Sequence, residues 1–186
     1  MYVEALDEAA FYGPKLDVQA KNVHGKEDTL FTAQMDFLLP QKFEMEYVDA
    51  NGEKKRPVMI HRSTIGCLER VFGFLIEHYG GAFPTWLSPT QVTILPVSEK
   101  FIDYAKKVEL ALKEANIRVH LDNQSETLGK RIRNNKMLKI PYMIVVGQKE
   151  VGSDTVTVEC RNKEQLKDLK IDDFVAIIQK EILNKQ

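Results

Sequence analysis

A histidine and an arginine stand nine residues apart where a predicted strand passes into a predicted helix. His61 follows the apolar run at residues 57–60, and Arg70 lies in a segment whose apolar residues recur at spacings of three and four. A guanidinium in that place can bind a phosphate through two hydrogen bonds or stack on an aromatic base. Ser63 and Gly66 are small enough to let a ligand approach the backbone between them. The stretch therefore predicts a strand–helix unit that can hold a phosphate or a base.

Two polar side chains, Gln34 and Asp36, alternate with apolar neighbours in a predicted strand over residues 30–38. Alternate residues of a strand share a face, so both side chains point the same way. Such a pair favours a ligand site or a mutual contact. An antiparallel sheet also often leaves one face wet, and on the pattern alone this second interpretation is the commoner one.

The histidines and cysteines show no spacing typical of a metal site. His24, His78, His120, Cys67 and Cys160 are scattered along the chain and none is placed to join His61. A lone histidine at a strand end is more often a hydrogen-bonded structural residue than a ligand. The spacing alone therefore predicts no metal.

Six cations fall in one stretch of the second half, with no acid between the first of them and Glu150. They are Lys130, Arg131, Arg133, Lys136, Lys139 and Lys149. Because the formal net charge of the chain is only −1, the stretch is a local basic patch and not part of a basic protein. It predicts either contacts with nucleic-acid phosphates or a solvated helix face.

The pattern of predicted strands and helices changes along the chain, and we predict a domain boundary between residues 88 and 89. The first part reads as strands, a hairpin and one helix, and the second as alternating strands and helices, which predicts an α/β protein. In the first part we expect a short strand before a turn at 12–14, strands over 16–20 and 30–38, a turn at 40–43, a hairpin pairing 45–48 with 58–60, and a helix over 63–79. In the second we expect strands over 91–97, 117–121, 141–146 and 154–160, helices over 99–115, 125–137 and 171–183, and a turn over 147–152.

Composition bounds the class of protein. The chain has 186 residues, 44% hydrophobic and 28% charged, which suits one sizeable domain or two small ones. No apolar run is long enough to cross a membrane, and the N-terminus has no secretory signal pattern. Two cysteines make no disulfide framework. We therefore expect a cytoplasmic protein with neither membrane nor DNA as a partner.

Four short sequence motifs, taken together, resemble those of the threonyl-tRNA synthetase family. They are Ala-Phe-Tyr-Gly-Pro-Lys at 10–15, Gln-Met-Asp-Phe at 34–37, Pro-Val-Met-Ile-His-Arg at 57–62 and Gly-Ala-Phe-Pro-Thr-Trp-Leu at 81–87. Residues 61–70 look like motif 3 of the class II aminoacyl-tRNA synthetases. Residues 89–186 are similar to the anticodon-binding domain shared by the threonyl, prolyl, histidyl and glycyl enzymes. The resemblance implies an incomplete antiparallel class II catalytic sheet with its motif 3 helix over 1–88, then an α/β anticodon-binding domain with a mixed, largely parallel sheet over 89–186.

The resemblance also implies an activity, in which threonine and ATP with magnesium give threonyl-adenylate and threonine passes to tRNA(Thr). It implies a zinc ion, a homodimer for the full-length enzyme, and a set of site residues. In that set Arg70 and Lys15 are catalytic, Tyr12, Gln34 and Asp36 bind threonine or the adenylate, Arg70 and Gln34 bind ATP, and His61 is a zinc ligand. Glu150, Arg133, Lys149 and Arg161 are implied contacts of the tRNA anticodon.

Some residues depart from the family pattern. Glu159 stands where the family has an arginine, and we expect Arg161, which shares its strand face, to substitute. Gln124-Ser125-Glu126 replaces Arg-Asn-Glu, and Thr29 stands where a glutamine contacts the nucleotide.

Motifs 1 and 2 of the class II synthetases are missing from the sequence. We therefore expect the C-terminal part of a longer enzyme, inactive alone, with an exposed sheet edge and exposed apolar surface. The alternative is a non-catalytic tRNA- or RNA-binding or regulatory protein that reuses the anticodon-binding fold. The presence of His61, Arg70, Tyr12 and Gln34 favours the synthetase.

Overall fold

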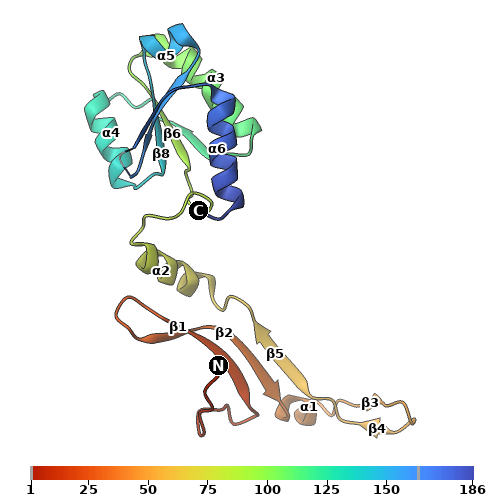
Figure 1. Cartoon of the computed structure of the whole chain (residues 1–186). Coiled ribbons are helices and arrows are strands. Elements are labelled where there is room, and N and C mark those ends of the chain that lie inside the picture. The colour runs from red at the N-terminus through yellow and green to blue at the C-terminus, as the bar shows by residue number, and fades with distance from the viewer. Residues whose placement is uncertain (1, 163) are drawn as a thin grey trace. The chain divides into compact units, whose positions relative to one another are not determined.

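The computed structural model describes residues 2–162 and 164–186, and the chain divides between His78 and Tyr79 into two compact units (Figure 1). The first unit contains a three-stranded antiparallel sheet, and the second a five-stranded mixed sheet with helices. The predicted α/β class, with an antiparallel sheet followed by a mixed one, is confirmed.

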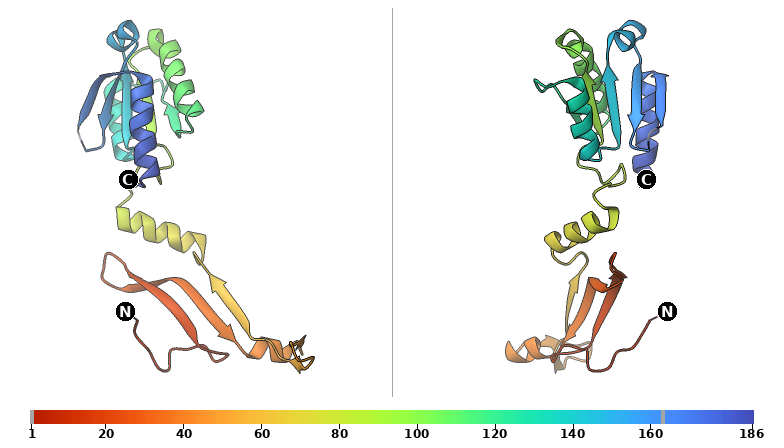
Figure 2. Two further views of the ribbon diagram at one scale, coloured as in Figure 1. Left: turned by 45° about the vertical axis from the view of Figure 1, so that its right-hand side comes forward. Right: turned by 90° about the vertical axis from the view of Figure 1, so that its left-hand side faces the viewer.

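The sheet of the first unit has the order β1-β2-β5, and Figure 2 shows the three strands side by side. Its strands are β1 (Lys15–Lys21), β2 (Glu27–Asp36) and β5 (Met59–Ser63). The remaining elements of this unit are α1 (Leu38–Lys42), the hairpin strands β3 (Tyr47–Val48) and β4 (Lys54–Lys55), and α2 (Leu68–Tyr79).

Three predictions for the first unit are wrong. β3 pairs with β4 and not with residues 58–60, because the Asp49 carboxylate accepts hydrogen bonds from the N–H groups of Asn51 and Glu53 and closes the turn early. Residues 59–63 pair with β2 instead. The turn expected at 40–43 is α1. Among residues 2–14 the only pairing is an isolated bridge, so these residues do not form the short strand predicted there.

The register of the first sheet places Lys15, Gln34 and His61 opposite one another on three neighbouring strands. Directly paired residues project from the same face of a sheet, and we call this set the polar row. The opposite face is apolar and open to solvent, with Leu16 59% and Ile60 67% exposed. The expectation of exposed apolar surface is therefore confirmed.

The sheet of the second unit has the order β10-β9-β8-β6-β7. Pairing is parallel in β7-β6-β8 and antiparallel from β8 through β9 to β10, so less of the sheet is parallel than expected. The strands are β6 (Val92–Pro96), β7 (Val119–Leu121), β8 (Tyr142–Val146), β9 (Val156–Cys160) and β10 (Gln165–Leu169). β10 was not predicted.

Helices cover both faces of this sheet. They are η1 (Glu99–Phe101), α3 (Ile102–Glu114), α4 (Leu128–Met137), α5 (Gln148–Ser153) and α6 (Ile171–Leu183). Figure 1 shows α3 and α6 on one face and α4 on the other. The main core lies between the sheet and helices α3 and α6, where Ile94, Leu112 and Phe174 are fully buried.

One helix boundary and one turn in the second unit differ from the sequence prediction. α4 begins after Thr127, whose hydroxyl accepts from Lys130 N–H, and not at Ser125. α5 replaces the turn expected over 147–152, because the Glu150 carboxylate accepts from Gly147 N–H and caps the first turn.

The linker, residues 80–91, is hydrogen-bonded to the second unit. Arg118 donates from Nη2 to Trp86 O at 2.7 Å and from Nε to Ser88 O at 2.9 Å. Arg161 Nη1 donates to Phe83 O at 2.8 Å, and the buried Gln91 amide donates to Thr85 O. These bonds make the linker part of the second unit. Across the described part of the chain, no helix combines the length and apolarity needed to span a membrane.

Candidate functional sites

The first candidate site is a cavity of about 480 Å³ at one end of the polar row. Residues from the 11–12 segment, β2, α1 and β5 surround it, so the antiparallel register is what assembles the site. The lining consists of Phe11, Tyr12, Gln34, Asp36, Leu38, Leu39, Lys42 and His61. Three of the predicted substrate residues and the predicted metal ligand are therefore brought together.

Asp36 is the buried polar centre of this pocket, at 2% exposure. Its Oδ1 accepts hydrogen bonds from Leu38 N–H at 2.8 Å and Leu39 N–H at 2.9 Å, which fixes the start of α1. Its Oδ2 lies 2.9 Å from His61 Nε2. Burial alone would raise the pKa of Asp36, but these hydrogen bonds outweigh it and lower the pKa. The carboxylate is therefore held in its charged form with both oxygens already engaged.

Tyr12 is positioned over the neighbouring glutamine of the polar row. Its hydroxyl donates to Gln34 Oε1 at 2.5 Å, and its ring meets the His61 ring edge to face. The backbone beside it lies very close to β2, since a Cβ on Gly13 would come within 2.3 Å of Met35 O. Glycine at that position allows the contact that places Tyr12 in the pocket.

His61 alone does not form a zinc site with the described residues. Its Nε2 is engaged with Asp36, which leaves Nδ1 as the only other ring nitrogen for a metal. No group of three or more His, Cys, Asp or Glu residues suited to a metal ion occurs within 2–162 and 164–186. Structural and catalytic zinc sites need at least three protein ligands. The residues present therefore do not fit the metal by themselves.

The two predicted catalytic residues do not line this pocket. Lys15 is opposite Gln34 in the polar row, but its ammonium binds the Asp17 carboxylate at 2.7 Å. That contact raises the pKa of Lys15 and lowers the pKa of Asp17. Arg70 lies on α2 with its side chain exposed. Gln34 lines this cavity and Arg70 does not, and their joint action on one nucleotide stays a prediction.

The second candidate site contains the predicted anticodon residues of the second unit. Glu150 is already engaged on both oxygens, by Gly147 N–H at 3.0 Å and by the Thr157 hydroxyl at 2.9 Å. Lys149 pairs with Asp168 at 2.7 Å, and this contact raises the pKa of Lys149. Both side chains therefore already have partners within α5, β9 and β10.

The remaining two anticodon candidates, Arg161 and Arg133, differ in whether their side chains are already hydrogen-bonded. Arg161 Nη1 donates to Phe83 O and Lys139 O, so this side chain fastens the linker. Arg133 is exposed on α4 and has no hydrogen-bond or ion-pair partner among the residues that the structure describes. Glu159, where the family pattern has an arginine, pairs with Lys136 at 2.6 Å.

A buried polar network that the sequence analysis missed lies beneath this region. Arg131 donates from Nε to Asp122 Oδ1 at 3.1 Å and from Nη1 to Pro96 O at 2.9 Å. Asn135 Nδ2 donates to Asp122 Oδ2 at 2.8 Å. Arg131 and Asn135 recur with Leu128 at spacings of three and four, and this periodicity is the signal that could have placed them on the inner face of the helix.

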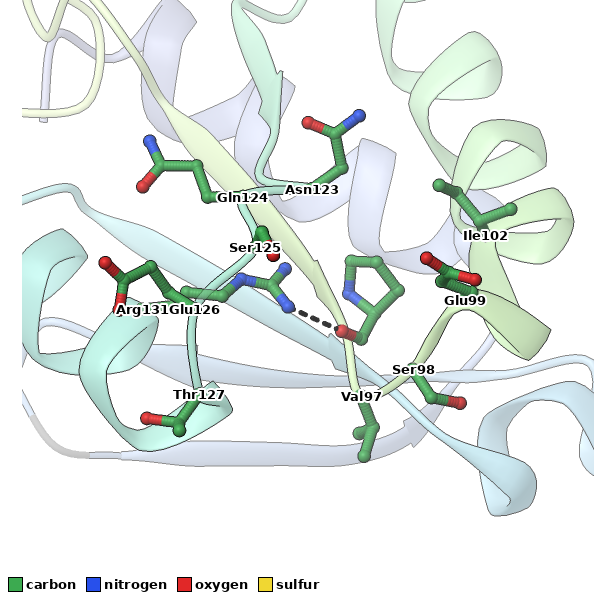
Figure 3. A pocket seen from close by; sticks show the side chains of 11 residues that line it. Val97, Ser98, Glu99, Ile102, Asn123, Gln124, Ser125, Glu126, Thr127 and Arg131 are labelled. Carbon is green, nitrogen blue, oxygen red and sulfur yellow. Dashed lines mark hydrogen bonds between the residues drawn. The ribbon is translucent and has the colours of Figure 1, made fainter.

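The network borders a cavity of about 580 Å³, which Figure 3 shows from close by. One wall is the loop after β6, with Val97, Ser98 and Glu99, and the other is the loop after β7, with residues 123–127. The cavity therefore includes Gln124 and Ser125, two positions where this chain departs from the family pattern.

Two family models match the chain, one on each unit. The tRNA synthetase class II core domain (G, H, P, S and T) matches residues 2–79, and the anticodon binding domain matches residues 91–181.

Curated relatives and solved structures match in the same way. Threonine–tRNA ligases of Clostridium botulinum (strain Eklund 17B / Type B) and Streptococcus pneumoniae (strain Hungary19A-6) are 52% and 49% identical, each over 185 residues. These alignments cover 100% and 99% of this chain but 29% of each relative, so the chain spans less than a third of their length. The RNA binding domain of threonyl-tRNA synthetase from Cryptosporidium parvum Iowa II superposes with a TM-score of 0.78 at 36% identity, covering 94% of this chain and 44% of that one.

A prolyl-tRNA synthetase structure from Cryptosporidium parvum, at 22% identity, shares the fold. Its TM-score is 0.79, and the match covers 98% of this chain and 40% of that one.

Proposed function

This chain belongs to the threonyl-tRNA synthetase family of class II aminoacyl-tRNA synthetases and matches its C-terminal part. We therefore propose that it acts as the C-terminal part of a threonine–tRNA ligase. In that enzyme the threonine carboxylate attacks the α-phosphorus of ATP, pyrophosphate leaves, and the threonyl group then passes to the 3′ end of tRNA(Thr) with release of AMP. We assign residues 1–88 to the catalytic domain and 89–186 to the anticodon-binding domain. The observation that carries the proposal is the pocket around the buried Asp36 in the first unit, joined in one chain to an anticodon-binding fold.

In the first unit we assign the pocket to threonine and the adenylate. Gln34 can donate from its amide nitrogen, Asp36 places a negative charge in the pocket, and Tyr12 holds the Gln34 amide in one orientation. A site built from fixed hydrogen-bonding groups discriminates strongly against a substrate that lacks the matching hydroxyl. Gln34 and Arg70 are assigned to ATP, and Lys15 and Arg70 to stabilisation of charge as pyrophosphate leaves. Arg70 is exposed on α2 and does not line the pocket.

The metal and assembly assignments belong to the longer enzyme. We propose, on the family resemblance, that His61 supplies one zinc ligand there; the described residues include no further ligand set. Magnesium would accompany ATP as part of the substrate. A cytoplasmic location and a homodimer are proposed on the same family basis.

In the second unit we assign Arg133, Lys149, Glu150 and Arg161 to the anticodon loop of tRNA(Thr). Anticodon bases are unstacked and are read on their edges, while cations hold the phosphates. Arg133 is the best placed of the four, because its guanidinium is exposed and unpaired among the described residues. Arg161 retains Nε and Nη2 for such a contact, since both of its bonds to the chain use Nη1.

The test is binding of the 186-residue chain to a threonine anticodon stem-loop and to the same stem-loop with altered anticodon bases, over a salt series. We expect a preference for the threonine anticodon that persists at moderate salt, because base contacts are less salt-dependent than phosphate contacts. Equal binding of both stem-loops that fades steeply with salt would contradict anticodon recognition. It would favour the alternative, an RNA-binding protein that reuses the fold.

A further inference from the structure

The outward face of α4 carries three cations in a row. Lys130, Arg133 and Lys136 recur every three residues and are all exposed, so they are neighbours on the helix surface; we call them the α4 stripe. The sheet-facing side of the helix holds Arg131 and Asn135, both buried. A stripe of this kind would attract the phosphates of any RNA by charge alone.

Acidic side chains hold the two outer cations of the stripe. Lys136 Nζ lies 2.6 Å from Glu159 Oε1 on β9, and Lys130 Nζ lies 2.7 Å from Glu126 Oε1. The Glu159 side chain is 23% exposed and Glu126 is 38% exposed, so water screens the Glu159 pair less. Arg133 stands between them without a partner among the described residues.

We propose that Glu159 limits the sequence-independent affinity of the RNA-binding face, because it holds Lys136 as an internal counter-ion and leaves Arg133 as the free cation of the α4 stripe. The proposal rests on the proposed binding of tRNA by this unit. A phosphate that pairs with Lys136 must displace Glu159 and then lie beside an unpaired carboxylate. Since phosphate contacts supply most of the non-specific affinity for RNA, the internal pair weakens binding of every sequence and leaves discrimination to base contacts.

The experiment compares Glu159→Gln with a matched control, Glu109→Gln. Glu109 on α3 pairs with Lys113 at 2.7 Å and is 20% exposed, so each variant loses one negative charge from a comparable ion pair. The probes are the threonine anticodon stem-loop, its altered-anticodon partner and a single-stranded oligouridylate, each over a salt series with the whole chain. Trp86 fluorescence and circular dichroism verify that each variant is folded.

For Glu159→Gln we expect oligouridylate to bind about fivefold more tightly, as for one added exposed ion pair. The log–log salt slope should steepen by about 0.7 to 0.9, the value of one further phosphate contact. Preference for the threonine anticodon over the altered anticodon should stay the same, since the added phosphate contact strengthens binding of both stem-loops by the same factor. Glu109→Gln should change none of these quantities.

A second variant, Lys136→Gln, keeps the proposal testable if Glu159→Gln fails to fold. It removes a cation that is already paired, so the salt slope should fall by less than in Arg133→Gln, which removes the same charge from the unpaired cation of the stripe. An equal or larger fall in Lys136→Gln would mean that Lys136 itself binds phosphate in the wild type, which overturns the proposal.

The remaining outcomes distinguish failure of the role proposed for Glu159 from failure of the proposed tRNA binding. An unchanged slope in Glu159→Gln, or an equal change in Glu109→Gln, overturns the role of Glu159 while a threonine anticodon preference still stands. Absence of RNA binding by every variant overturns both. RNA binding that emerges only in Glu159→Gln supports the role of Glu159.

Discussion

At the scale of single residues, Arg131 holds the loop that precedes α4. Its guanidinium is 5% exposed and bonds the Asp122 side chain and the backbone of Pro96, so removal leaves the buried Asp122 charge without its cation. We expect Arg131→Met to destabilise the second unit by about 3–5 kcal/mol, the usual cost of breaking a buried ion pair from one side. Urea unfolding followed by the fluorescence of Trp86, the one tryptophan of the chain, measures this directly.

The matched control for that substitution is Arg133→Met on the same helix. Arg133 is exposed and unpaired among the described residues, so the free energy of unfolding should change by no more than about 0.5 kcal/mol. Similar losses in the two variants would show that helix propensity or net charge, and not the buried network, decides the stability.

Asp122 predicts how the same unit responds to acid. Burial alone would raise its pKa, but hydrogen bonds from Gln124 N–H, Asn135 and Arg131 outweigh burial and lower the pKa below the usual 3.8. The unfolded chain therefore binds the proton more readily, so the contribution of Asp122 is complete above pH 3.8 and is lost as the pH falls through the lowered value.

Urea unfolding of wild type and Asp122→Asn over the acid range measures this contribution. The stability of the wild type should fall more steeply with decreasing pH than that of the variant. Parallel pH profiles for the two proteins would contradict the assignment.

At the scale of elements, the contact between residues 11–14 and β2 depends on a glycine. An alanine at position 13 would place its Cβ 2.3 Å from Met35 O, so the backbone must move apart. We expect Gly13→Ala to destabilise this pairing by about 1–3 kcal/mol, as for other overpacked contacts, and to withdraw Tyr12 from Gln34. Faster amide hydrogen exchange at Met35 and Phe37, whose N–H groups bond Pro14 O and Tyr12 O, is the measurement.

Gly73→Ala serves as the control for the glycine experiment. Gly73 lies within α2, and a Cβ added there would meet no atom within 4 Å outside the helix's own backbone, so alanine should fit and favour the helix by about 0.5–1 kcal/mol. Exchange in β2 should stay unchanged in this variant. A Gly13→Ala protein with wild-type exchange would mean that the segment adapts without loss.

Elements with a strong apolar pattern could be predicted from the sequence, whereas those defined by distant partners could not. β8 is a nearly continuous apolar run and α6 repeats its apolar residues at three and four, so both were expected close to their observed bounds. β10 lacks β-branched and aromatic residues and has a mostly exposed pattern, so nothing local marks it as a strand.

The same limit applies to the candidate sites. Alternation placed Gln34 and Asp36 on one face correctly, because the side-chain period of a strand is a local property. The polar row also needs the register of three strands, and the Lys136–Glu159 pair joins residues far apart in the sequence. A stretch of cations in the sequence therefore predicted a basic surface, while the structure pairs most of those cations within the protein.

At the scale of the whole molecule, the two units differ in how much apolar surface they bury. In the part of the chain that the structure describes, the buried core residues all lie between positions 92 and 178. No residue of α2 is buried, and Phe72 and Ile76 are 60% and 54% exposed. Since burial of apolar surface is the main source of folding stability, the second unit should be much the more stable one.

Amide hydrogen exchange and urea unfolding of the whole chain test this difference. Amides of β2 and β5 should exchange through openings that cost several kcal/mol less than those of β6 and β8, about the span between local and global unfolding. Trp86 should report the second unit alone, because the linker around it is bonded to Arg118. Circular dichroism should therefore show an earlier loss of signal than fluorescence. Coincident transitions and equal protection in both sheets would mean that the units unfold as one, which would contradict the expected difference in stability.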